Sequence, residues 1–310
     1  MVQIAITSGK GGTGKTTVAL GLALTGGPLT LIDADVEEPN CQVLLAGEPM
    51  GKEPAKVMVP TFAEDACARC GHCARACRFN ALVVGNRGHL LFPELCHGCG
   101  ACQLVCKHGA IREGEREIGV ISRFARGDIR LLEGRLNVGE TSGVPLIRQL
   151  KRKAVKEDLA IVDSPPGTSC NMVAAVAGAN YCLLLTEPTL FGRHDLEAAL
   201  TVVEALGIPK GVVINRSGDG DGLIEEICRQ RGVPVLARIP HDGKLAEAYA
   251  EKPSVRAGCR YPGGAEPDPV RCGSGDQRQH RPQGLQSLVG QRDPGLYRFW
   301  DDRGRSGGGI

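Results

Sequence analysis

Residues 2–17 read VQIAITSGKGGTGKTT, an apolar strand pattern that runs directly into a glycine-rich loop. Residues 9–16 of this stretch fit the pattern G-x-x-x-x-G-K-[ST] of a phosphate-binding loop, and an apolar helix pattern (VALGLAL) follows at once. That context distinguishes a genuine phosphate-binding loop from a chance match. Glycines let the backbone wrap closely around a phosphate, and the helix N-terminus directs its N–H groups toward the anion. The stretch therefore predicts a nucleotide site.

Two side chains of this loop are expected to contact the phosphates and their metal ion. Lys15 would reach the β- and γ-phosphates, and the Thr16 hydroxyl would ligate Mg²⁺. We accordingly predict ATP and Mg²⁺ as ligands. The residues expected to bind the nucleotide within the loop are Gly11, Gly12, Thr13, Gly14, Lys15, Thr16 and Thr17.

Eight of the fourteen cysteines form two runs with one spacing, C-x2-C-x2-C-x3-C. The offset between counterparts is constant, and Ala81 and Ala110 share it, which indicates a duplicated unit. In this spacing three near cysteines take three corners of an iron–sulfur cube, and the fourth ligates the cluster of the other run. The predicted ligands are Cys67, Cys70, Cys73 and Cys106 for cluster 1 and Cys96, Cys99, Cys102 and Cys77 for cluster 2, both [4Fe–4S].

Two zinc sites with four thiolates each are the alternative for these cysteines. Structural zinc usually uses two CxxC pairs separated by a longer loop, whereas three cysteines in succession suit a cube better. A disulfide framework is not indicated, because the N-terminus shows no secretory signal pattern. We therefore expect a reducing, cytoplasmic location in which thiols are available for metal.

Length and charge narrow the classes of function. The 310 residues allow one large core plus a small module. A formal net charge of +2 argues against nucleic acid or a membrane surface as a partner, and no apolar run is long enough to span a bilayer.

The string KGGTGKT at residues 10–16 resembles the deviant Walker A motif of the MinD/ParA ATPases, which include the nitrogenase iron protein and the Mrp-type iron–sulfur carriers. In that family the extra lysine, here Lys10, reaches across a dimer interface to the partner's nucleotide. The resemblance implies a slow, partner-regulated ATP hydrolase whose active state is an ATP-bridged homodimer. It also implies catalytic roles for Lys10, Lys15 and Asp35.

Further motifs of this resemblance follow in the family's order. Residues 33–40 (DADVEEPN) resemble switch I, in which Asp35 matches the carboxylate that orients the attacking water and Asp33 lies where it can support Mg²⁺. Residues 163–168 (DSPPGT) resemble Walker B and switch II, so that Asp163 would bind Mg²⁺ through water. Asn215 matches the position that reads adenine. Taken alone, each such residue can also be a cap or turn former.

The strand patterns predict the fold class. Apolar runs at 2–7, 29–32, 159–162, 181–186, 211–214 and 235–239 alternate with helical patterns. This alternation predicts an α/β fold with a mostly parallel sheet covered by helices, and a nucleotide at the carboxyl ends of the strands.

The expected domain organisation is discontinuous. Residues 58–107 resemble a bacterial two-cluster ferredoxin, a small α+β domain, although Arg78 and Lys107 replace the proline that usually follows each fourth cysteine. We expect an ATPase domain of residues 1–57 and 108–255, the inserted ferredoxin domain, and a tail of residues 256–310. The tail is rich in Arg, Gly and Pro without apolar periodicity, and is either disordered or the product of a reading-frame shift.

The remaining cysteines are assigned mainly to the core. Cys41, Cys182 and Cys228 lie in apolar or helical patterns, and Cys170, directly after switch II, is expected to be a small buried side chain. In the resembling family a cysteine at the position of Cys170 lies near the dimer interface.

Three functions remain open. The first is a MgATP-dependent ATPase that couples its nucleotide state to electron transfer with an unidentified partner protein. The second is an ATP-dependent carrier or assembly factor for iron–sulfur clusters, and the third, less favoured, is a positioning ATPase of the MinD/ParA type. Eight thiolates in this spacing suit retention of clusters, which favours electron transfer over delivery.

Overall fold

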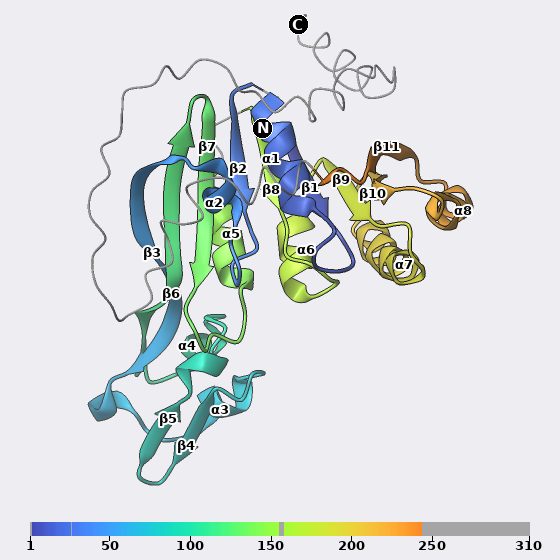
Figure 1. Cartoon of the computed structure of the whole chain (residues 1–310). Coiled ribbons are helices and arrows are strands. Elements are labelled where there is room, and N and C mark those ends of the chain that lie inside the picture. Colours follow the sequence, from blue (N-terminus) through green and yellow to red (C-terminus); the bar gives the residue numbers. More distant parts are fainter. Residues whose placement is uncertain (1, 26, 155–157, 244–310) are drawn as a thin grey trace, which may run out of the picture.

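The computed structural model describes residues 2–25, 27–154 and 158–243. Within these residues a nine-stranded sheet forms the centre of the molecule, in the order β11-β10-β9-β1-β8-β2-β7-β6-β3 (Figure 1). The strands are β1 Val2–Thr7, β2 Leu29–Asp33, β3 Glu48–Phe62, β6 Ile111–Arg126, β7 Ile129–Leu136, β8 Leu159–Asp163, β9 Tyr181–Thr186, β10 Lys210–Ser217 and β11 Val235–Pro240. Neighbours from β11 to β7 are parallel, whereas β6 pairs antiparallel with both β7 and β3.

Helices cover both faces of the sheet. Side chains alternate between the two faces along each strand, so neighbouring residues of one strand pack against different helices. Ala5 packs into one core with buried residues of α5, α6, α7 and α8, and its neighbour Ile6 packs into a second core with α1 and α2. A strand buried on both faces needs a continuous apolar run, which is the pattern of β1. The helices are α1 Lys15–Thr25, α2 Cys41–Leu45, α5 Val144–Lys153, α6 Cys170–Val176, α7 Leu190–Ala205 and α8 Asp221–Arg231.

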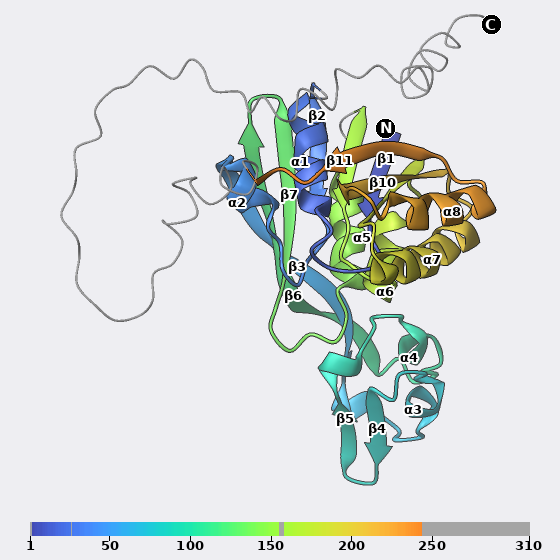
Figure 2. The same ribbon diagram turned by 45° about the vertical axis from the view of Figure 1, so that its right-hand side comes forward.

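The two cysteine runs form a separate module at the end of the long β3–β6 ribbon (Figures 1 and 2). Each run begins after a short 3-10 helix and enters a short α-helix through a glycine with positive φ, Gly71 at +72° and Gly100 at +74°. The two repeats therefore have the same local structure. The elements of this module are η1 Glu64–Ala66, α3 His72–Ala76, β4 Leu82–Gly85, β5 Gly88–Leu91, η2 Pro93–Leu95 and α4 Ala101–Leu104.

The α/β fold and the mostly parallel sheet confirm the prediction, and each predicted strand is present. The burial of Cys41, Cys182 and Cys228 is also confirmed. The prediction for Cys170 is wrong: its side chain is exposed. It is the first residue of α6, and the buried face of that helix is formed by Met172, Ala175 and Val176 instead.

Strand β3 continues through the expected boundary between residues 57 and 58, so the ribbon belongs to both the sheet and the module.

Residues 244–255 and the tail at 256–310 lie outside the described residues. No helix in the described part of the chain is long and apolar enough to cross a membrane.

Candidate functional site

The predicted phosphate-binding loop lies at the carboxyl end of β1, between the neighbouring strands β8 and β9. It leads into α1, whose first residue, Lys15, is buried. A Cβ on Gly9 would lie 2.1 Å from the carbonyl oxygen of Asp195 in α7, so only glycine fits there. Gly14 has a φ of +94°, in the region that favours glycine. Two of the motif's glycines are therefore required by the geometry of the loop.

The three residues predicted to bind Mg²⁺ lie together. Asp33 and Asp163 end the adjacent parallel strands β2 and β8 and are paired in register. The Thr16 hydroxyl, in the first turn of α1, donates a hydrogen bond of 2.6 Å to Oδ2 of Asp163. Carboxylate and hydroxyl oxygens are the ligands that Mg²⁺ prefers. The carboxyl ends of parallel strands thus assemble the site, as the strand order requires.

The electrostatics of these carboxylates favour a bound cation. Burial, together with the charge of Asp163, raises the pKa of Asp33 to about 8. Burial likewise raises the pKa of Asp163, whose Oδ1 is a buried oxygen without a hydrogen-bond partner among the described residues. Because a divalent cation would offset the mutual repulsion and contact the free oxygen, the donor set fits Mg²⁺.

Lys15 and Asp35 lie in the same electrostatic environment. Burial lowers the pKa of Lys15, while the charges of Asp163 and Asp35 oppose this shift. Burial, with the charge of Asp163, raises the pKa of Asp35 to about 6. Lys15 and Asp35, two of the three predicted catalytic residues, therefore lie near the carboxylates of the predicted metal site.

Cys41 is a neighbour of this site that the sequence did not indicate. Its thiol donates to Oδ2 of Asp163 at 3.5 Å, and its backbone N–H donates to Oδ2 of Asp33 at 2.9 Å. The apolar helix pattern of α2 predicted only that Cys41 is buried. No signal in the sequence distinguished a thiol that faces carboxylates from one in an apolar core.

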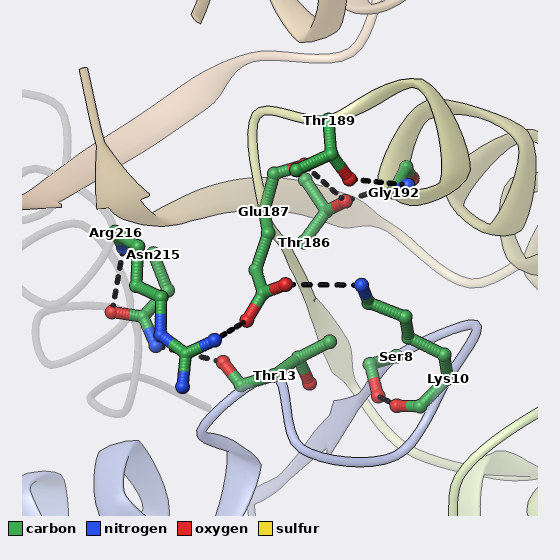
Figure 3. A network of polar contacts seen from close by, with 9 residues as sticks. All are labelled: Ser8, Lys10, Thr13, Thr186, Glu187, Thr189, Gly192, Asn215 and Arg216. Carbon is green, nitrogen blue, oxygen red and sulfur yellow. Dashed lines mark hydrogen bonds and ion pairs between the residues drawn. The ribbon is translucent and has the colours of Figure 1, made fainter. Parts of the chain in front are cut away.

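Lys10 is held by an acidic residue of its own chain (Figure 3). Its Nζ lies 3.0 Å from Oε2 of Glu187, which follows β9, and the same carboxylate accepts a hydrogen bond of 2.6 Å from Nη1 of Arg216. Glu187 is buried, and the loop that contains it is fixed at the start of α7, where Thr189 Oγ1 accepts from the N–H of Gly192. Glu187 and Arg216 were not predicted, since neither belongs to a recognised motif.

Asn215 contacts the phosphate-binding loop directly. Its Nδ2 donates to the carbonyl oxygen of Thr13 at 2.8 Å, and a Cβ on Gly14 would lie 2.5 Å from the same nitrogen. The side chain therefore supports the loop from β10. Recognition of adenine by Asn215 stays a prediction.

The eight clustered cysteines line two separate hollows in the module. Their grouping follows the predicted exchange of the fourth cysteine between the runs. One hollow is lined by Cys67, Cys70, Cys73 and Cys106, and the other by Cys77, Cys96, Cys99 and Cys102, each set together with apolar, glycine and histidine neighbours.

The spacing of the sulfurs bears on what each hollow could hold. Asp33, Cys41 and Asp163 have ligand atoms that all lie within 4.8 Å of one another. Among the described residues, no other group of three or more potential metal ligands is this close. No three of the eight sulfurs are therefore that close together. Sulfurs around a tetrahedral zinc are about 3.8 Å apart, given a Zn–S bond of about 2.3 Å. The sulfurs of each set are thus not placed as closely together as they would be around one zinc ion.

Comparisons with known proteins agree with this fold. A family model described as the CobQ/CobB/MinD/ParA nucleotide binding domain matches residues 4–255. The uncharacterized protein MJ0579 of Methanocaldococcus jannaschii is 30% identical over 258 residues, which cover 81% of this chain and 90% of that protein. An iron-sulfur cluster carrier protein of the same organism is 25% identical over 269 residues, 79% of this chain and 74% of that protein.

Among solved structures, the septum site-determining protein MinD of Pyrococcus horikoshii, complexed with Mg-ADP, aligns with a TM-score of 0.49 and 20% identity, covering 83% of this chain and 88% of that one.

The family match extends over most of the chain and includes the phosphate-binding loop, the paired aspartates and Asn215. This chain therefore belongs to the CobQ/CobB/MinD/ParA family of nucleotide-binding domains.

Proposed function

We propose that this protein is a MgATP-dependent ATPase that binds two [4Fe–4S] clusters and couples its nucleotide state to electron transfer with a partner protein. One observation carries the proposal: the same chain has a phosphate-binding loop beside paired aspartates and two sets of four cysteines that line separate hollows. The family match supports nucleotide binding, and the width of the sulfur sets supports clusters over zinc.

The nucleotide site has the groups that phosphoryl transfer needs. Lys15 and the loop amides would stabilise the negative charge that develops on the transferring phosphoryl group. The Thr16 hydroxyl now donates to Asp163 and would turn to Mg²⁺, with Asp163 and Asp33 binding the ion through water. Asp35, near Lys15, would orient the attacking water.

A second copy of this chain is the proposed partner at the nucleotide. Lys10 is paired with Glu187 within one chain, and release from Glu187 would let it reach a second nucleotide. Two large apolar side chains next to Glu187 are exposed, Leu190 at 71% and Phe191 at 81%. Exposed apolar side chains of this size at a functional site are typical of an interface.

The module would bind the clusters through the eight predicted cysteines. When bound, such clusters supply one-electron carriers whose potentials depend on nearby charge and hydrogen bonds. The chain places aromatic pairs beside them: Phe79 stacks on His97 with ring centroids 3.9 Å apart, and Phe62 stacks on His89 at 3.7 Å. These pairs fix the walls of the two hollows, which Phe79 and Phe62 line.

Delivery of clusters is the second candidate function, and the similarity to an iron-sulfur cluster carrier protein favours it. Cys70 and Cys99 are exposed, so an acceptor protein could reach them. The two functions differ in the fate of the clusters. Mixing the holoprotein with an apo-acceptor and MgATP should leave the iron on this chain if it transfers electrons, and rapid loss of iron would favour the carrier.

The nucleotide half of the proposal is tested with Lys15→Ala. We expect this change to abolish ATP turnover while the absorbance of the clusters is unchanged, because Lys15 lies in the loop and not in the module. Lys56→Ala is the matched control, since Lys56 is exposed on β3 and pairs with Glu115. ATP turnover at the wild-type rate in Lys15→Ala would overturn the assignment of the loop.

A further inference from the structure

The segment at residues 137–143, between β7 and α5, lies against the residues that follow β2. The backbone N–H of Leu136, the last residue of β7 directly before this segment, donates to the carbonyl oxygen of Val36 at 2.8 Å. At its other end, a Cβ on Gly143 would lie 2.6 Å from Cγ2 of Val36. Val36 directly follows Asp35, the predicted water-orienting residue. The residues that follow β2 and this segment are therefore in direct contact.

The same segment also touches the residues that follow β8. A Cβ on Gly143 would lie 3.2 Å from the side-chain oxygen and nitrogen of Asn171, in the first turn of α6. Asn171 in turn donates to Oε1 of Glu37 at 2.9 Å. Both chain segments that emerge from the predicted metal-binding aspartates thus meet at Gly143. Close packing of this kind transmits displacements because the interior has little free volume.

The middle of the segment reaches the second cysteine run. Thr141 Oγ1 donates to the carbonyl oxygen of Glu94 at 2.9 Å, two residues before Cys96. Glu140 forms a bidentate ion pair with Arg116 of β6, in which Nη2 donates to Oε2 at 3.0 Å. The hydrogen bond to Glu140 raises the pKa of Arg116, and the nearby Glu94 and Cys96 add to this shift. Arg116 therefore lies in the electrostatic environment of the second run.

The two runs differ in their distance from the sheet. In both views of the ribbon, α4 of the second run lies nearer the nine-stranded sheet than α3 of the first run (Figures 1 and 2). The hollow of the second set is lined by Met58 and Pro60 of β3, whereas that of the first set reaches only Phe62, the last residue of this strand. Cluster 2 is thus the one placed to respond to the nucleotide.

We propose that Glu140 screens the positive charge of Arg116 from cluster 2, and that a nucleotide-driven shift of residues 33–37 displaces Glu140 through the segment at 137–143. This inference rests on the proposed function and specifies its regulation. Because a nearby cation favours the more negative, reduced form of a cluster, loss of the screening carboxylate raises the reduction potential. Arg116 and Glu140 are positioning residues for that potential, and cluster 1 does not share the effect.

The test uses anaerobically prepared holoprotein and an EPR-monitored redox titration with ADP and with a non-hydrolysable ATP analogue. Separate Cys67→Ser and Cys96→Ser variants assign the signals to the two clusters. In the wild type, the analogue shifts the potential of cluster 2 in the positive direction and leaves cluster 1 unchanged. In Glu140→Gln, the potential of cluster 2 with ADP is already shifted in the positive direction, and the difference between nucleotides is lost.

Glu115→Gln is the matched control, because Glu115 lies on the same strand as Arg116 but is exposed and pairs with Lys56. It should keep the wild-type response. An equal shift of both clusters, or a wild-type nucleotide response in Glu140→Gln, would overturn the inference while the proposed function stands. Absence of clusters or of ATP turnover in the wild type would instead overturn the proposed function.

Hydrogen exchange gives a second measurement on the wild-type holoprotein, which does not depend on any variant. The amides of Leu136 and Asn137 are bonded to Val36 and Ile118. Their exchange rates should differ at least several-fold between the ADP and analogue states. Equal protection in both states would contradict a moving segment.

Discussion

Gly9 and Gly11 lie in one loop but have different surroundings. A Cβ on Gly9 would lie 2.1 Å from a backbone oxygen of α7, whereas a Cβ on Gly11 would have no neighbour within 4 Å. We expect Gly9→Ala to lower the free energy of unfolding by roughly 1–3 kcal/mol, as overpacking against backbone does. Gly11→Ala should change it by less than about 0.5 kcal/mol. Urea denaturation of the nucleotide-free protein measures both, and equal losses would contradict the packing described.

Asp33 makes the stability of the nucleotide-free protein depend on pH. Its ordinary pKa of 3.8 applies to the unfolded chain, and burial raises the value to about 8 in the folded chain. Between these values the folded state binds more protons, so the free energy of unfolding decreases as pH rises from about 4 to about 8. Without Mg²⁺ and nucleotide, Asp33→Asn should stabilise the protein at pH 8.5.

The gain for Asp33→Asn should exceed about 1 kcal/mol, since one pKa unit corresponds to about 1.4 kcal/mol. Its stability should also depend less on pH than that of the wild type. Asp65→Asn is the control, because Asp65 is exposed in η1 and should keep the wild-type slope. A destabilised Asp33→Asn at pH 8.5 would show that the carboxylate is favourable in the empty site.

The arrangement of the cysteines could be predicted where it depends on local spacing in the sequence. The spacing of the two runs predicted which four cysteines lie around each hollow, since ligand spacing is a local property of the chain. Contacts between residues distant in sequence left no such signal. Glu187 with Lys10 and Glu140 with Arg116 are ordinary charged residues until the fold pairs them. The burial predicted for Cys170 was wrong because apolar neighbours in sequence do not fix the direction of a helix's first residue.

At the level of elements, the loop between β9 and α7 positions Glu187, which forms an ion pair with Lys10 of the same chain. Glu187→Gln removes the charge that binds Lys10, so we expect dimers to form with an ATP analogue at about 2–5-fold lower protein concentration, in line with the loss of a modest ion pair. Analytical ultracentrifugation measures this. Glu197→Gln is the control on α7, since Glu197 pairs with Arg193 away from Lys10. Unchanged or weaker dimerisation in Glu187→Gln would show that the ion pair between Glu187 and Lys10 does not oppose dimerisation.

Apolar runs predicted six of the nine strands of the sheet, namely β1, β2, β8, β9, β10 and β11, but not β3, β6 or β7. The strands from β10 to β2 in the sheet order show apolar runs because helices cover both sides of the sheet there. Strand β3 was not predicted, since it contains Pro49, Pro54 and Pro60 and several charged residues. It lies at the edge of the sheet with one neighbour, β6, and an edge strand tolerates proline because one side of its backbone needs no partner.

At the scale of the whole molecule, two units share one continuous ribbon. Strands β3 and β6 pair from Glu48 with Ala125 to Phe62 with Ile111, and so join the sheet to the cysteine module without a flexible linker. The paired ribbon and the packed segment at 137–143 are two structural connections between the sheet that bears the nucleotide site and the second cysteine run. The sequence predicted the inserted unit from its repeat, but the ribbon that joins it emerged only from the pairing of distant strands.

The metal and sulfide content of protein purified without oxygen tests the central claim most directly. Two [4Fe–4S] clusters require about eight iron and eight acid-labile sulfide per chain. We predict these values for the wild type, and about half of each in Cys96→Ser if that change empties one site. Protein that contains about two zinc ions per chain and no sulfide would contradict the account.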